Sequence, residues 1–202
     1  QVDIFKKGIQ TVKVEKAATP DDGILQLDNI DAPVAHDIYI IENKKEVTKF
    51  IPASGAASRM FKALHQLKAE VDKNLLPISK LLQQGEFVSL KAFFDQFEKF
   101  AFAEEAKQSA KKNNPDFDQL SQDDQHKALL AAVLDENQLG LAELPKGLIP
   151  FHQYEDQNLT PFEEHFYEAA DYANQEDKAH LHFTVTEDHL TGFKEVEKRS
   201  KS

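Results

Sequence analysis

The spacing of apolar residues predicts that the middle of the chain is almost wholly helical. Apolar side chains recur there at the intervals that place them on one buried face of a helix. The first such stripe consists of Phe61, Leu64, Leu67 and Val71. Pro77 interrupts the pattern and Gly85 ends the short turn of helix after it, but helical spacing resumes beyond both. We therefore expect residues 61–144 to form a block of helices.

A run of phenylalanines marks a further helix inside this block. Ser89 is placed to cap that helix. The aromatic residues that follow at helical spacing are Phe93, Phe94, Phe97, Phe100 and Phe102. Because apolar stripes on helices usually face a core, we interpret these residues as core packing and not as a ligand cage.

The last helix of the block carries a start signal of its own. After a break at residues 111–117 (KKNNPDF), Ser121 and Asp124 have the spacing of a capping box. The predicted buried stripe behind this cap consists of Leu129, Leu130, Val133 and Leu134.

The pattern changes at residues 144–151 (LPKGLIPF), a compact apolar segment with two prolines. A strong helix signal follows, with Thr160 as N-cap, Pro161 at the first helical position and Glu163 at the third. The buried face of this helix is predicted to consist of Phe162, Phe166, Ala169, Ala170 and Ala173. β-Branched and aromatic residues then predict a strand at 179–186, and a helix follows whose charged end (KEVEKRSKS) is typical of a solvated terminus.

The beginning of the chain gives weaker signals. Asp31 is a candidate cap for a helix over residues 33–45, and residues 46–52 (EVTKFIP) have the pattern of a short strand. Leaving the helical block aside, strands and helices alternate along the rest of the chain. This alternation predicts an α/β fold with parallel strands.

Charge and composition exclude several classes of partner. The formal net charge of −11 argues against general binding to nucleic acid or to anionic membranes. No apolar run approaches the length of a membrane span, and the absence of cysteine excludes disulfides and thiolate metal sites. A cytoplasmic location is the default expectation.

The most informative stretch is the loop between the predicted strand and the first helix of the block. It has small side chains at Ala53, Ser54, Gly55, Ala56 and Ala57. Small residues let phosphate groups approach backbone N–H groups, and Gly55 can adopt a positive φ at little cost. Ser58 could cap the helix or donate to phosphate, and Arg59 offers a charged planar fork. From the residues alone, a simple structural turn with a solvated Arg59 is as good an interpretation.

The loop resembles the activator loop of the sugar nucleotidyltransferases, or pyrophosphorylases. Residues 52–60 (PASGAASRM) are similar to the family pattern LAAGxGTRM. The segment 145–151 (PKGLIPF), the helix that starts at Thr160 and the strand at 181–189 are similar to later motifs of that family, and they come in the same order. More closely, the chain resembles the N-terminal part of an uncharacterised bacterial family, domain of unknown function 4301, which looks like pyrophosphorylases with a helical insertion.

The resemblance implies a fold and an activity. It implies a partial Rossmann-like, GT-A-type core made of residues 47–60 and 145–202. Residues 61–144 would then be a helical insertion and residues 1–46 an N-terminal extension, and the whole chain would be the N-terminal part of a longer protein. It implies transfer of a nucleotidyl group from a nucleoside triphosphate to a sugar 1-phosphate, with Mg²⁺ held by residues outside this chain. Carried over residue by residue, the nucleotide-binding positions are Ala53, Ser54, Gly55, Ala56, Ser58 and Arg59, and the catalytic ones are Arg59 and Lys146.

Two other interpretations stay open at this stage. One is a non-catalytic nucleotide-binding or interaction module, because Ser54 and Ala57 stand where the resembled loop has glycines. The other is an α/β scaffold without a ligand. His180 and His182 share one side of a strand, but with no further ligand in view we interpret them as packing residues and not as a metal site.

Overall fold

The computed structural model describes residues 2–8, 11, 13–20, 22–24, 39, 42, 46–74, 76–174 and 178–200. The chain divides into two units, residues 1–46 and 47–202. The helix predicted over residues 33–45, with its cap at Asp31, falls outside the described residues except at Tyr39 and Glu42.

The first unit has little regular structure in its described part. It contains the helix α1 (Val2–Lys7), which has no buried residue, and the strands β1 (Thr19–Pro20) and β2 (Gly23–Ile24), which pair in parallel. Gly23 has a φ of 96°, a conformation that glycine adopts readily, so it sits where the chain must turn.

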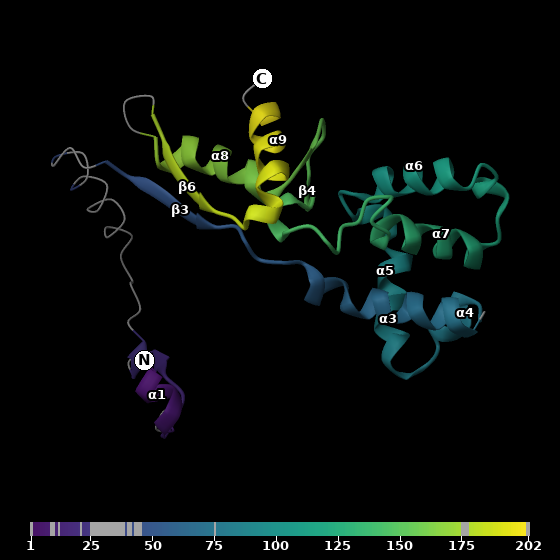
Figure 1. The fold of residues 1–202 in the computed structure, drawn as a ribbon, viewed down its shortest axis with the longest axis horizontal. Helices are drawn as coiled ribbons and strands as arrows, with labels where there is room; N and C mark the ends of the chain where they lie inside the picture. Colours follow the sequence, from purple (N-terminus) through teal and green to yellow (C-terminus); the bar gives the residue numbers. More distant parts are fainter. Residues whose placement is uncertain are drawn as a thin grey trace. The chain divides into compact units, whose positions relative to one another are not determined.

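The second unit contains a parallel two-stranded sheet flanked by two helices (Figure 1). Strand β3 (Thr48–Pro52) pairs with strand β6 (His180–Thr184). The two strands come from distant parts of the sequence. Helices α8 (Pro161–Tyr172) and α9 (Leu190–Ser200) pack against each other beside this sheet. Their small core centres on Phe162, whose ring lies 4.4 Å from that of Phe183 and 5.0 Å from that of Phe193. The predicted combination of helices with parallel strands is confirmed.

Helix α8 begins as its sequence predicts. The Thr160 side chain accepts a hydrogen bond from the backbone N–H of Glu163, and the Glu163 carboxylate accepts one from the backbone N–H of Thr160. One prediction for this helix is wrong, because Ala170 is exposed. It lines an open hollow, so no neighbouring element covers that part of the helix surface.

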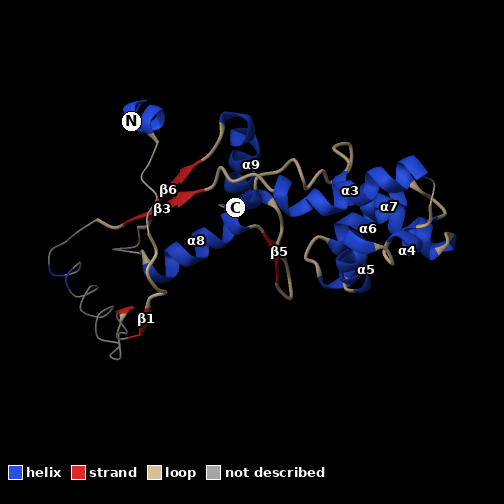
Figure 2. Ribbon diagram, turned by 90° about the horizontal axis from the view of Figure 1, so that it is seen from below, coloured by secondary structure: helices blue, strands red, loops and turns tan. Residues whose placement is uncertain are grey.

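The middle of the chain is helical from residue 58 to residue 134, with short breaks (Figure 2). The bounds are α3 Ser58–Asn74, α4 Ile78–Leu81, η1 Gly85–Leu90, α5 Lys91–Asp95, η2 Phe97–Lys99, α6 Ala103–Asn113, η3 Phe117–Gln119 and α7 Gln122–Leu134. These elements enclose the larger hydrophobic core of the unit. Residues 135–144, predicted as part of the block, form turns.

The phenylalanine-rich segment is not one helix. It is divided among η1, α5 and η2, and Ser89 lies inside η1, where it caps nothing. Aromatic residues are weak helix formers, and here their rings pack on one another. Phe93 has ring-centroid distances of 5.1 Å to Phe94, 5.5 Å to Phe97 and 5.2 Å to Phe100. Clustering of the rings therefore decides the local path of the chain, and their role in the core is confirmed for Phe94, Phe97 and Phe102.

Helix α7 agrees with its predicted start and buried face. The Ser121 side chain accepts from the backbone N–H of Asp124 at 3.3 Å. The predicted stripe residues are all buried, namely Leu129, Leu130, Val133 and Leu134.

Short elements complete the unit. They are η4 (Lys146–Leu148), the antiparallel strands β4 (His152–Gln153) and β5 (Asn158–Leu159), and η5 (Glu187–His189). Among the described residues, no helix is both long and apolar enough to pass through a membrane.

Candidate functional site

The loop at residues 53–57 (the glycine loop) and the segment at residues 145–151 (the lysine segment) lie against each other, although they are far apart in the sequence. The backbone N–H of Lys146 donates to the carbonyl of Gly55 at 2.9 Å, and that of Ala57 donates to the carbonyl of Leu144 at 3.3 Å. Ala56 stands opposite Pro145 in an isolated antiparallel bridge. The backbone itself therefore fixes the start of η4 beside the loop that ends β3.

The loop leaves backbone donors open. Within the described part of the chain, the N–H groups of Ser54, Gly55 and Ala56 make no hydrogen bond, whereas that of Ala53 donates to Thr184 at 2.9 Å. Gly55 is not among the glycines with a positive φ, and a Cβ built on it would meet no atom within 4 Å. Neither backbone conformation nor packing therefore requires glycine at this position. Open N–H groups beside an uncrowded glycine form a surface that an anion can approach.

A small hollow of about 210 Å³ lies between this loop and helix α8. Its lining includes Gly55 of the loop, Lys146 of η4 and His165 of α8. The hollow is below the usual size of a site for a whole small molecule, about 300–1,000 Å³. It suits a group of the size of a phosphate or diphosphate. The other residues around it are Ile51, Pro52, Ala53, Gly147, Pro161, Phe162 and Phe183.

Four of the predicted residues do not line this hollow, namely Ser54, Ala56, Ser58 and Arg59. Ser58 is the first residue of α3, and the capping position before it is occupied by Ala57, whose carbonyl accepts from Met60 at 2.8 Å. Arg59 is exposed on the first turn of α3 and does not line the hollow. The structure thus brings Ala53, Gly55 and Lys146 together, and leaves Ser58 and Arg59 at the adjoining helix start.

Sequence reasoning missed His165 and the residues that hold it. The Nδ1 atom of His165 lies 2.8 Å from Oε2 of Glu168, and the same carboxylate oxygen accepts from the Lys49 ammonium group. That ammonium group lies 4.7 Å from the centre of the Tyr172 ring. The hydrogen bonds from Lys49 first, and from His165 second, lower the pKa of Glu168 to about 2. Only the spacing of His165 and Glu168 on one helix could have suggested the pair from the sequence.

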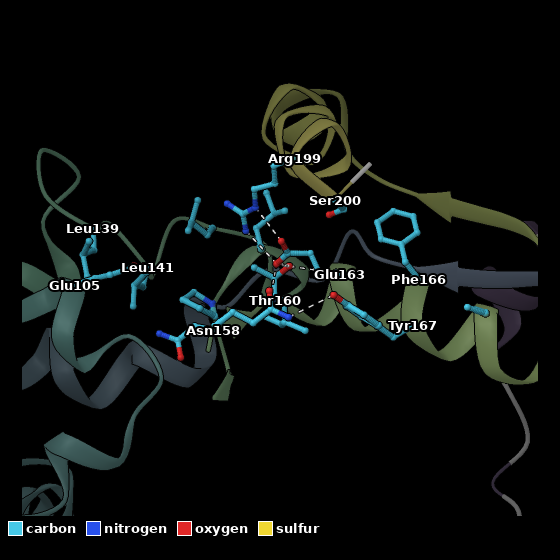
Figure 3. A pocket seen from close by; sticks show the side chains of 16 residues that line it. Glu105, Leu139, Leu141, Asn158, Thr160, Glu163, Phe166, Tyr167, Arg199 and Ser200 are labelled. Atoms are coloured by element: carbon cyan, nitrogen blue, oxygen red, sulfur yellow. Dashed lines mark hydrogen bonds and ion pairs between the residues drawn. The ribbon is translucent and has the colours of Figure 1, made fainter. Parts of the chain in front are cut away.

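A larger hollow of about 860 Å³ is lined by residues of α8, α9 and the segments before them (Figure 3). Its lining includes the charged residues Glu163 and Arg199 and five leucines. The leucines are Leu139, Leu141, Leu144, Leu148 and Leu159.

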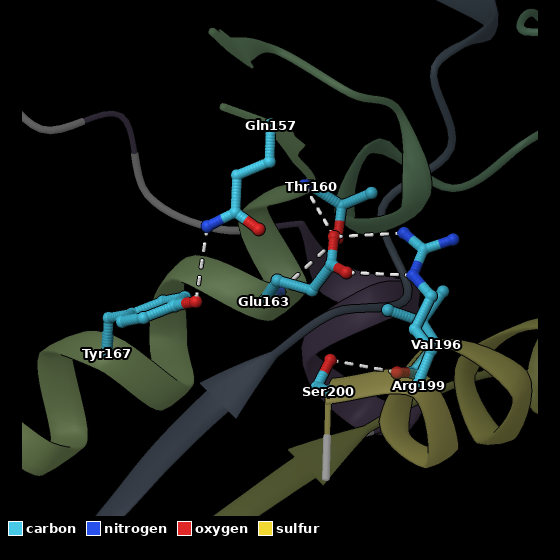
Figure 4. A network of polar contacts seen from close by, with 7 residues as sticks. All are labelled: Gln157, Thr160, Glu163, Tyr167, Val196, Arg199 and Ser200. Carbon is cyan, nitrogen blue, oxygen red and sulfur yellow. Dashed lines mark hydrogen bonds and ion pairs between the residues drawn. The ribbon is translucent and has the colours of Figure 1, made fainter. Parts of the chain in front are cut away.

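Glu163 and Arg199 form an ion pair between α8 and α9 (Figure 4). The Glu163 carboxylate is buried and accepts from Arg199 Nε at 2.8 Å, Arg199 Nη2 at 3.0 Å and Thr160 N at 2.8 Å. Burial on its own raises the pKa of Glu163, but the hydrogen bonds from Arg199 and Thr160 together hold that pKa below its ordinary value. The capping role predicted for Glu163 is confirmed. The end of α9 is solvated as predicted, since the Arg199 side chain is 58% exposed, but its guanidinium group also pairs with a residue of a neighbouring helix.

The residues that the structure describes include no group of three or more histidines, aspartates or glutamates able to hold a metal ion. Among the residues that the structure describes, no carboxylate lines the hollow beside Lys146, so the donor set there does not fit Mg²⁺. His182 is exposed and stacks on the exposed ring of Phe50, with ring centroids 5.1 Å apart.

A family model described as Domain of unknown function (DUF4301) matches residues 1–202, and the chain therefore belongs to that family. No curated protein and no solved structure matches the chain. The resemblance to sugar nucleotidyltransferases thus rests on the sequence motifs alone.

Proposed function

We propose that this member of the DUF4301 family binds the phosphates of a nucleoside triphosphate between the glycine loop and Lys146, and transfers the nucleotidyl group to a phosphorylated sugar. The observation that carries the proposal is the pairing of the two motifs. Lys146 N–H donates to the carbonyl of Gly55 at 2.9 Å, although nothing about either segment taken alone requires them to meet.

The chemistry of such a transfer matches the groups of the glycine loop and Lys146, in and beside the hollow. A phosphate oxygen of the sugar attacks the α-phosphorus, the bond to the β-phosphate oxygen breaks, and pyrophosphate leaves with the negative charge of that oxygen. Positioned N–H donors and fixed cations stabilise charge that develops in this way. The N–H groups of Ser54, Gly55 and Ala56 and the Lys146 ammonium group would hold the leaving pyrophosphate.

Arg59 and the start of α3 contribute from beside the hollow in this proposal. The first turn of a long helix attracts anions, and Ala57 has no side-chain oxygen to occupy its N–H groups. The guanidinium of Arg59, on that same turn, can reach phosphates that extend beyond the hollow. Mg²⁺, when bound with the nucleotide, supplies further charge neutralisation, but we assign no ligand for it to this chain.

A non-catalytic binding module is the alternative function. The observation that favours it is the hollow of about 860 Å³ beside Glu163 and Arg199, which is large enough for a whole organic ligand. In that case the glycine loop is a structural turn and the ligand binds in this larger hollow.

The test measures thermal unfolding of the protein with each common nucleoside triphosphate and with inorganic pyrophosphate, in the presence of Mg²⁺. A ligand at a hundred times its Kd should stabilise the folded protein by about 2.7 kcal/mol. We expect Lys146→Gln to reduce this shift strongly. The matched control is Lys80→Gln, which changes an exposed lysine on α4 and should leave the shift unchanged.

Two results contradict the proposal. One is the absence of a shift with every triphosphate and with pyrophosphate; the other is a Lys146→Gln variant that responds like the parent. The non-catalytic module would be favoured if the protein binds a nucleoside triphosphate but releases no pyrophosphate with any sugar 1-phosphate.

A further inference from the structure

His165 lies at the same hollow as the glycine loop and Lys146, but on a different element. It projects from the first half of α8, where its side chain is partly buried, and lines the hollow together with Gly55 and Lys146. Three segments from distant parts of the sequence therefore bring Gly55, Lys146 and His165 to the lining of one small space.

Glu168 fixes which ring nitrogen of His165 remains for a ligand. The Glu168 carboxylate is ionised at any ordinary pH, because the hydrogen bonds of Lys49 and His165 lower its pKa to about 2. An ionised carboxylate only accepts hydrogen bonds, so the Nδ1 atom of His165, 2.8 Å away, must carry the hydrogen. Nε2 is then the nitrogen left for a ligand, and it has no hydrogen-bond partner within the described residues.

Glu168 is itself anchored from the sheet. Lys49 on β3 donates to the carboxylate oxygen that contacts His165, and its ammonium group lies over the Tyr172 ring. The Lys49 side chain is only 11% exposed, whereas the Glu168 side chain is 46% exposed, so the anchor is packed on the side of the lysine. A histidine held on one side by a carboxylate that is in turn held by a second residue is the usual arrangement where a ring must be oriented toward a ligand.

We propose that His165 is a further phosphate-binding residue of the loop–lysine site, and that Glu168 is its positioning residue. The inference rests on the proposed function, because its ligand is the polyphosphate of that site. Nε2 of His165 would form a hydrogen bond with a phosphate oxygen across the hollow from the loop. A protonated Nε2 donates to that oxygen, and an unprotonated Nε2 accepts from a phosphate O–H group. Lys49 acts one step further away, through Glu168.

The experiment measures the Kd of inorganic pyrophosphate by calorimetry for two substitutions of His165. Asparagine places its side-chain nitrogen near Nδ1, so His165→Asn keeps the contact with Glu168 and removes the group at Nε2. Glutamine places its nitrogen near Nε2, so His165→Gln keeps a donor at the hollow. We expect His165→Asn to weaken pyrophosphate binding about tenfold and His165→Gln to weaken it much less. His65→Gln, an exposed histidine on α3, is the matched control and should bind like the parent.

The role of Glu168 is tested by a double-mutant cycle. Glu168→Gln should weaken binding in the parent, but should have no further effect in the His165→Asn background, because Glu168 acts through the imidazole ring. An equal loss in both backgrounds would overturn the positioning role.

The failures of the two proposals are distinguishable. If His165→Asn binds pyrophosphate like the parent while Lys146→Gln does not, the role of His165 is overturned and the loop–lysine site stands. If the parent itself binds no pyrophosphate, the proposed function fails and this inference fails with it. Unfolding midpoints of all variants, measured alongside, show whether a loss of binding reflects a loss of folding.

Discussion

Replacing Gly55 by alanine should make the protein slightly more stable and its phosphate site much weaker. The backbone of Gly55 does not have a positive φ, and an added Cβ would meet no atom within 4 Å. Alanine at such a position restricts the unfolded chain more than the folded one, which stabilises a protein by about 0.4–1 kcal/mol. In a domain of this size, that corresponds to an increase of about 1–4 °C in the unfolding midpoint.

The effect on binding has the opposite sign. In the proposed site, phosphate oxygens approach the N–H groups of Ser54, Gly55 and Ala56 through the space that the new methyl group would enter. Loss of one hydrogen bond to a charged group costs about 1.5–3 kcal/mol, which corresponds to about a 10- to 150-fold weaker affinity. A glycine kept only as a turn residue would show no such loss.

Gly147→Ala provides the contrast. A Cβ on Gly147 would lie 3.2 Å and 3.4 Å from ring carbons of Phe193, so alanine crowds a packed aromatic side chain. Overpacking of this kind costs about 1–3 kcal/mol, and the unfolding midpoint should fall. Calorimetric unfolding of both variants, with pyrophosphate titrations of Gly55→Ala, tests the reasoning. A Gly55→Ala variant that is destabilised, or that binds pyrophosphate as the parent does, would refute it.

Two further predictions concern stability. Arg199→Ala should lower the free energy of unfolding by about 1 kcal/mol, a small value because the guanidinium group is largely exposed. Glu163→Ala also removes the helix cap and should lower the free energy of unfolding by about 2–3 kcal/mol. Glu195→Ala on α9 is the control for both. Because the pKa of Glu163 is lowered in the folded protein, the Glu163 carboxylate stabilises the fold above pH 4.5, the ordinary pKa of a glutamate, and this stabilisation is lost as the pH falls further. Glu163→Gln should therefore make the free energy of unfolding depend less on pH in the acid range. Burial lowers the pKa of His126, which stacks on Phe94, so stability is complete above the ordinary value of 6.5 and declines below it. His126→Phe should remove that decline, which urea unfolding at about pH 7.5 and about pH 5.5 would detect; an unchanged difference between the two pH values would contradict it.

The features that the sequence predicts well are local. The caps at Ser121 and Thr160 each depend on residues within one turn, and both form as their spacing indicates. The parallel pairing of β3 with β6 follows from the alternation of strands and helices. In each case the residues that decide the structure are close in the sequence or follow a regular pattern.

The features that sequence reasoning missed depend on side chains that meet only in the folded chain. The phenylalanine run divides into short helices because its rings pack on one another, which helical spacing does not express. Glu163 has a visible capping role, but its partner Arg199 lies on another helix. His165 is one of many histidines in the sequence, and only its position beside Lys146 and its contact with Glu168 distinguish it.

The most direct test of the account is a titration of the ¹⁵N-labelled protein with inorganic pyrophosphate, followed by amide chemical shifts. Our account predicts that the amides of Ser54, Gly55 and Ala56 and the backbone of Lys146 shift most, since these groups surround the proposed phosphate position. Shifts confined to the hollow beside Glu163 and Arg199, or no saturable shift at the glycine loop, would contradict it.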